Sequence, residues 1–121
     1  MTALRVLVVD DDTMIGALLA EMLAGMGYDV CGVEASEAGA VAAARSCSPD
    51  LIIMDAQLGD GSGVGAITRI LSTGYVPHVF ISGDVSRIRA LNPGAIVLQK
   101  PFHEAQLARA IERAIATEAP G

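Results

Sequence analysis

Val6-Leu7-Val8-Val9-Asp10-Asp11-Asp12 joins an uninterrupted apolar run to three consecutive acids. Four apolar residues in a row are typical of a parallel strand that is buried on both faces. Three adjacent carboxylates raise the cost of ionising one another, so their position at the end of such a strand needs a physical reason. The stretch predicts a buried strand that delivers acidic groups to one edge of a sheet.

Similar apolar runs recur along the chain, and segments with helical character separate them. Strands are expected over residues 4–9, 28–33, 51–54, 76–81 and 95–98. Helical spacing of apolar residues marks 14–23, 64–71 and 107–115, the Ala-rich stretch 36–47 is helical by propensity, and 85–91 has room for about two turns. Five such rounds predict a doubly wound α/β fold, with a five-stranded parallel sheet and helices on both faces.

Composition and charge narrow the function classes. The chain has 121 residues, of which 52% are hydrophobic and 18% charged, and we expect a single domain over 1–121 with no effector domain. A net charge of −6 disfavours binding to nucleic acid or to an anionic membrane. Cys31 and Cys47 match no zinc pattern and are expected as buried thiols, and without a secretory segment the expected compartment is the cytoplasm.

Polar residues follow the predicted strands at the edge where ligands bind in such sheets. If the first and third strands are neighbours, about 4.8 Å apart, Asp10, Asp11 and Asp55 share one small volume. Oxygen ligands without His or Cys favour Mg²⁺ or a similar ion. Ser82 and Lys100 add a hydroxyl and a cation suited to phosphoryl oxygens. The set indicates phosphoryl transfer with a carboxylate nucleophile, for which Asp55 stands alone at its strand end.

VLVVDDD, LIIMD, FISGD and QKPF, in this order along almost the whole chain, resemble the receiver domain of bacterial two-component response regulators. The resemblance implies the flavodoxin-like strand order 2-1-3-4-5. It also implies that a sensor histidine kinase or a histidine phosphotransfer protein donates a phosphoryl group to this chain. The chain would then be a signalling phosphoacceptor and not an enzyme. A homodimer is compatible with the resemblance.

The same resemblance assigns roles to individual residues. Asp55 would accept the phosphoryl group. Mg²⁺, or Mn²⁺, would be held by Asp10, Asp11, Asp55 and the backbone carbonyl of Gln57. The Ser82 hydroxyl would reorient on phosphorylation, Lys100 would pair with the phosphoryl oxygens, and the bond between Lys100 and the following proline would be cis.

The chain departs from the family pattern at several positions. Val97 stands where receivers usually have an aromatic ring that moves with the hydroxyl, and the fourth helix is short. Both departures indicate an unusual output surface. Glycines replace the usual proline after Asp55, and Asp60 or Ser62 can cap the next helix. Asp84 either flanks the path of the hydrolytic water or is a solvated surface acid.

Two alternatives stay open at this point. A phosphatase resembling the haloacid dehalogenase superfamily would use Asp10 as nucleophile and Asp12 as general acid, but it leaves Asp55 and the Gly-rich segment without a role. A degenerate receiver would bind a partner without taking phosphate. In the receiver interpretation, Asp12 is left as an exposed helix cap.

Overall fold

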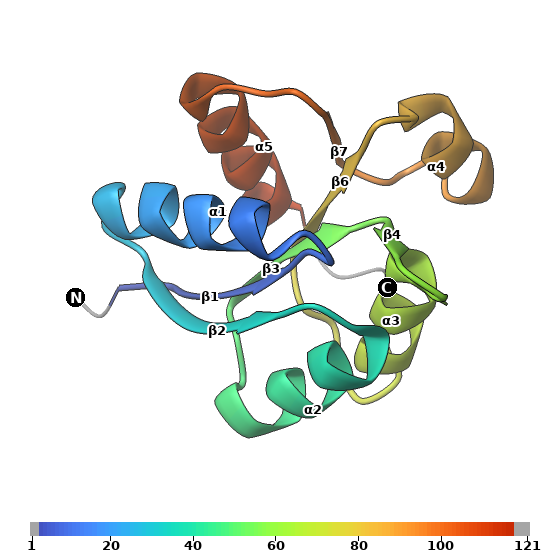
Figure 1. Cartoon of the computed structure of the whole chain (residues 1–121), viewed down its shortest axis with the longest axis horizontal. Coiled ribbons are helices and arrows are strands. Elements are labelled where there is room, and N and C mark those ends of the chain that lie inside the picture. Colours follow the sequence, from blue (N-terminus) through green and yellow to red (C-terminus); the bar gives the residue numbers. More distant parts are fainter. Residues whose placement is uncertain (1–2, 118–121) are drawn as a thin grey trace.

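Five parallel strands form the central sheet of the computed structural model, which describes residues 3–117 (Figure 1). In chain order they are β1 (Arg5–Val9), β2 (Asp29–Glu34), β3 (Leu51–Asp55), β6 (His78–Ser82) and β7 (Val97–Gln99). Their order across the sheet is β2-β1-β3-β6-β7, with every neighbouring pair parallel. Numbered among themselves, these strands have the order 2-1-3-4-5. The predicted doubly wound topology is confirmed, with strand ends displaced by one or two residues.

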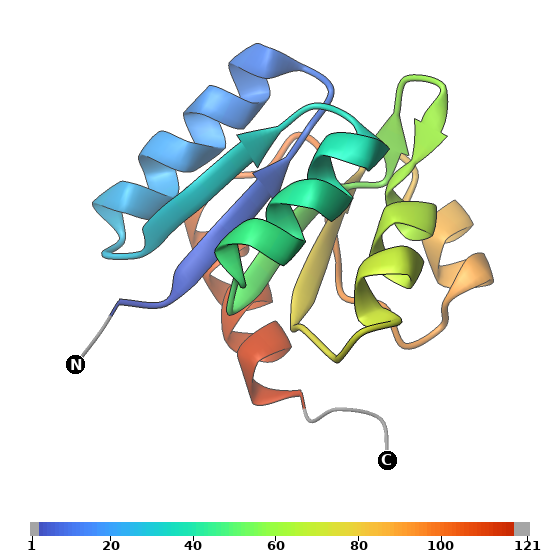
Figure 2. The ribbon, with the colours of Figure 1, turned by 90° about the horizontal axis from the view of Figure 1, so that it is seen from below.

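Five helices flank this sheet. They are α1 (Thr13–Gly25), α2 (Glu37–Cys47), α3 (Gly63–Leu71), α4 (Val85–Leu91) and α5 (Glu104–Ala116). Helices α1 and α5 cover one face, whereas α2 and α3 cover the other (Figures 1 and 2). The seven-residue α4 lies beside the β7 edge, apart from the other helices, as short as the sequence predicted (Figure 1).

The apolar run of β1 explains the two-layered core. Val6 and Val8 pack with the side chains of α1 and α5, while Leu7 and Val9 pack with those of α2 and α3. All four are fully buried. A strand between two helical layers must be apolar at every position, because both of its faces are removed from water.

One prediction about burial is corrected by the structure. Helix α1, expected from the spacing of its apolar residues, buries Leu19 and Leu23 and leaves Met14 and Leu18 exposed. The corrected prediction concerns the two thiols: Cys31, on the edge strand β2, and Cys47, the last residue of α2, are half-buried rather than buried. Burial, reinforced by the neighbouring Cys47 thiol, raises the pKa of Cys31 to about 12, which keeps it in the unreactive thiol form.

Among residues 3–117, no helix has both the length and the apolar character needed to cross a bilayer.

Candidate functional site

The carboxyl ends of β1 and β3 bring the predicted acids together. Parallel pairing of Val9 with Met54 places Asp10 and Asp55, the next residues on each strand, side by side. Both are buried, at 1% and 5% exposure, and Asp11 is exposed beside them. Oxygen atoms of Asp10, Asp11 and Asp55 all lie within 4.8 Å of one another. The sheet therefore assembles the acidic cluster that the sequence predicted.

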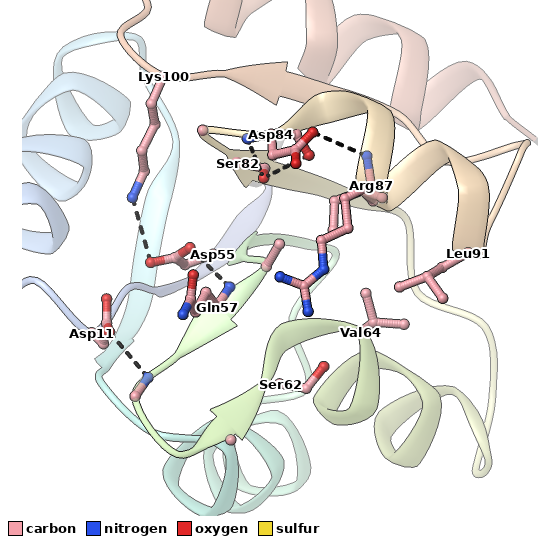
Figure 3. A pocket seen from close by; sticks show the side chains of 15 residues that line it. Asp11, Asp55, Gln57, Ser62, Val64, Ser82, Asp84, Arg87, Leu91 and Lys100 are labelled. Carbon is pink, nitrogen blue, oxygen red and sulfur yellow. Dashed lines mark hydrogen bonds and ion pairs between the residues drawn. The ribbon is translucent and has the colours of Figure 1, made fainter.

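Backbone amides hold these carboxylates in place. The amide of Asp12 donates to Asp10 Oδ1 at 2.9 Å. The amide of Gln57 donates to Asp55 Oδ1 at 3.1 Å, and the amide of Gly59 donates to Asp11 Oδ2 at 3.0 Å (Figure 3). Asp10 Oδ2 is buried and accepts no hydrogen bond from the described residues. A buried carboxylate oxygen without a hydrogen-bond donor, in a cluster of three carboxylates, fits a hard divalent cation.

Lys100, which follows β7, reaches into this cluster (Figure 3). Its Nζ lies 3.2 Å from Asp10 Oδ2 and 3.4 Å from Asp55 Oδ2. The first contact is an ion pair without hydrogen-bond alignment. Burial opposes the charge of Lys100, but the carboxylates of Asp55 and Asp10 outweigh it and raise the pKa of the ammonium group. The Lys100–Pro101 peptide bond is cis, as the sequence resemblance implied.

Asp55 is the most perturbed acid of the cluster. Burial raises its pKa from 3.8 to about 6, supported by the negative charge of Asp10 and opposed by the Gln57 amide and by Lys100. Ionisation of Asp55 beside Asp10 is therefore unfavourable in this site, and a further bound cation would make it more favourable.

The Ser82 hydroxyl faces helix α4 rather than Asp55. It donates to the backbone carbonyl of Asp84 at 3.1 Å and accepts from the Asp84 amide at 2.9 Å. The Asp84 side chain accepts from the Arg87 amide at 3.2 Å, so it caps α4. From the sequence, Asp84 was either a residue beside the path of the hydrolytic water or a solvated surface acid. The structure gives it a further role as the N-cap of α4. Asp12 likewise caps α1, as predicted.

The Gly-rich segment after Asp55 forms a small hairpin instead of a plain turn. Strands β4 (Gln57–Leu58) and β5 (Gly61–Ser62) pair antiparallel (Figure 2). Gly59 adopts a φ of 57°, a conformation that favours glycine. Of the two predicted caps for α3, Ser62 performs the role, and its hydroxyl accepts from the Gly65 amide at 3.1 Å.

Glu37, on helix α2, anchors this hairpin from outside the site. Its Oε1 accepts from the Ser62 amide at 3.0 Å, and its Oε2 pairs with Arg69 at 3.1 Å. The Ser62 amide and Arg69 together lower the pKa of Glu37. This role of Glu37 was not predicted from the sequence. An acid in the first turn of a helix is already favoured by the helix dipole, and nothing near Glu37 in the sequence indicates its distant partner.

Gly63 is required by a close backbone approach. A Cβ at this position would lie 1.9 Å from the carbonyl oxygen of Asp55, and the Gly63 amide donates to the Ala56 carbonyl at 2.9 Å. The start of α3 is therefore packed directly against the backbone of Asp55. Only glycine leaves room for this contact.

An open pocket of about 520 Å³ surrounds Asp55 (Figure 3). Lys100 and Asp11 line it on one side, and Arg87 and Leu91 of α4 line it on the other. Arg87 is an exposed residue of α4, and its side chain extends into this pocket (Figure 3).

Comparisons with known proteins agree with this geometry. The family model for the response regulator receiver domain matches residues 6–112. The chain belongs to this family, the receiver domains of two-component systems. The phosphatase alternative is therefore not retained.

Individual relatives are similar over nearly all of this chain but extend beyond it. The phyllosphere-induced regulator PhyR of Methylorubrum extorquens is 34% identical over 93% of this chain and 44% of its own length. The transcriptional regulatory protein PdtaR of Mycobacterium tuberculosis is 36% identical over 92% of this chain and 56% of its own. The chain thus spans about half of these relatives. The solution structure of the Erythrobacter litoralis PhyR receiver domain superposes with a TM-score of 0.89 at 29% identity, covering 100% of this chain and 97% of that one.

Proposed function

We propose that Asp55 accepts a phosphoryl group from a phosphohistidine of a sensor histidine kinase or a histidine phosphotransfer protein. The observation that carries this proposal is the contact of one buried carboxylate with both an acidic cluster and a lysine, at the floor of an open pocket. The chain would act as a signalling phosphoacceptor whose only chemistry is its own phosphorylation and dephosphorylation.

In the transfer, an oxygen of Asp55 forms a new P–O bond as the P–N bond of the phosphohistidine breaks, and the electron pair of that bond stays with the imidazole. Asp55 has to be ionised to attack, and Lys100 together with a bound cation would favour the charged form of this carboxyl, whose pKa burial raises. The Lys100 ammonium group lies 3.4 Å from Asp55 Oδ2, so after the transfer it can pair with the oxygens of the phosphoryl group on Asp55.

Asp10, Asp11, Asp55 and the Gln57 carbonyl are the residues we assign to Mg²⁺ or Mn²⁺. The bound ion would supply a Lewis-acid charge that lowers the repulsion between the carboxylates and the phosphoryl oxygens. Asp10 Oδ2, buried without a hydrogen-bond donor, supports this assignment from the protein side.

Ser82 would serve as the switch. Its hydroxyl is engaged with the backbone of Asp84, so turning it toward a phosphoryl oxygen breaks both contacts at the start of α4. Phosphorylation would therefore loosen or shift α4, and the changed surface would be read by a protein partner in the cytoplasm. The acidic net charge of −6 supports a protein partner over nucleic acid or a membrane.

Phosphoramidate, a small donor with a P–N bond, tests this function without knowledge of the kinase. With Mg²⁺, intact mass spectrometry of the wild type should show one added phosphoryl group, whereas EDTA or Asp55→Asn should abolish it. Asp12→Asn, which leaves the assigned cluster intact, should be phosphorylated like the wild type. Phosphorylation of the Asp55→Asn variant would refute the assignment, and a wild type that never gains mass would make the chain a degenerate receiver.

A further inference from the structure

Arg87 lies on the wall of the pocket opposite Lys100. Figure 3 shows its side chain running from the first turn of α4 across the pocket, with the guanidinium group turned toward Gln57. This direction brings a second cation to the cavity that holds the Asp55 carboxylate. Arg87 is exposed, so its guanidinium group is accessible to a group bound in the pocket.

The two cations of the pocket differ in what they already bind. Lys100 is held between Asp10 and Asp55, at 3.2 and 3.4 Å. Within residues 3–117 the Arg87 guanidinium group makes no ion pair and no hydrogen bond, and the Arg87 backbone amide donates to the Asp84 side chain. Its five guanidinium N–H groups are therefore available to an anion that enters the pocket.

Helix α4 is attached loosely enough to respond. Ile88 is the only one of its seven residues that is buried, and Leu91 at its end is 66% exposed. Its beginning is held by the Asp84 cap and by the two Ser82 hydrogen bonds. A new contact from Arg87 would thus act on a helix with few competing attachments.

We propose that Arg87 binds the phosphoryl group on Asp55 and ties the first turn of α4 to it, so that α4 reports phosphorylation. The inference rests on the proposed phosphorylation of Asp55 and adds the means by which it is read. A guanidinium group matches phosphoryl oxygens in pairs, and an acyl phosphate carries more negative charge than the carboxylate it replaces. Val97 occupies the position of the usual aromatic residue, so a ring cannot carry the signal there, whereas an arginine in α4 can.

Beryllofluoride, a phosphoryl analogue that binds with Mg²⁺ to the acceptor carboxylate, provides the test. Backbone NMR of the wild type should show shifts at the amides around Asp55 and through α4. In Arg87→Ala, the shifts at Asp55 and Gln57 and those that Ser82 causes at Asp84 should remain, whereas the shifts from Arg87 to Leu91 should be largely lost. The affinity for beryllofluoride should fall about tenfold. Arg89→Ala, on the same helix but outside the pocket lining, is the matched control and should respond like the wild type.

Arg87→Lys separates charge from geometry. A lysine keeps the charge but not the paired donors, and should give an intermediate response in α4. The proposal is overturned if Arg87→Ala and Arg89→Ala give the same α4 shifts and the same affinity. If the wild type itself does not bind beryllofluoride, the failure lies with the proposed function of Asp55, since every step beyond it depends on that binding.

Discussion

Asp55→Asn should make the metal-free protein more stable. At neutral pH the fold holds two negative charges, on Asp10 and Asp55, in buried positions with one lysine between them. The rise in the pKa of Asp55 from 3.8 to about 6 corresponds to about 3 kcal/mol, at about 1.4 kcal/mol per pKa unit. Asn removes this cost but needs its own hydrogen-bond partners, so we expect a gain of about 1 to 3 kcal/mol.

The dependence on pH follows from the direction of that pKa shift. Between about pH 4 and pH 6 the folded wild type keeps a proton on Asp55 that the unfolded chain releases, so this group makes the wild type less stable as the pH rises. Above pH 6 the full cost is present. Below pH 4 both states are protonated, and the advantage of Asp55→Asn should disappear.

Thermal unfolding in EDTA measures this difference. A gain of about 1 to 3 kcal/mol corresponds to a rise in Tm of roughly 4 to 12 °C at pH 7.5 for a domain of this size. Asp60→Asn changes the net charge equally at an exposed position and should shift Tm by no more than about 2 °C. An Asp55→Asn variant that is no more stable than the wild type at pH 7.5, or whose gain is the same at pH 4, would refute the electrostatic reasoning.

Three further variants probe the frame around the site. Gly63→Ala should lower the free energy of unfolding by about 1 to 3 kcal/mol, because the added Cβ would clash with the Asp55 backbone. Gly65→Ala, in the same helix, should not lower it. Equal stabilities of the two variants in urea unfolding would contradict this contact. Glu37→Ala should speed amide hydrogen exchange at Ser62 at neutral pH. This difference from the wild type should disappear in acid, where Glu37 of the wild type is protonated. Unchanged exchange at neutral pH would show that Glu37 does not anchor the hairpin. Mg²⁺ should raise the Tm of the wild type but scarcely that of Asp10→Asn, and a full rise in that variant would place the ion elsewhere.

The fold could be predicted from the sequence because short stretches of residues indicate which strands are buried and where acidic side chains follow them. The run before Asp10 is apolar at every position, and this already indicates a strand covered on both faces. Once the strands are parallel, their ends share one edge, so the meeting of Asp10, Asp11, Asp55 and Lys100 follows from topology alone. No such rule exists for the hairpin after Asp55, whose two-residue strands are set by Gly59 and by a distant anchor.

Residues that act through long-range contacts could not be predicted either, because no local sequence pattern indicates such contacts. Glu37 binds a segment 25 positions away, and Gly63 is dictated by a backbone approach that only the folded chain reveals. The direction of Arg87 depends on the placement of a short helix, which periodicity does not encode. Met14 and Leu18 show the converse, since apolar residues at helical spacing are not always buried.

The assignment of Asp55 as phosphoacceptor can be tested by locating the phosphoryl group on the chain. After reaction with phosphoramidate and Mg²⁺, borohydride reduces an aspartyl phosphate to homoserine, and peptide mass spectrometry identifies the position. We expect homoserine at position 55 and unchanged aspartate at positions 10, 11 and 12. Homoserine at position 10 with Asp55 unmodified would contradict it, because the opening acids would then be the acceptor rather than the holders of the metal.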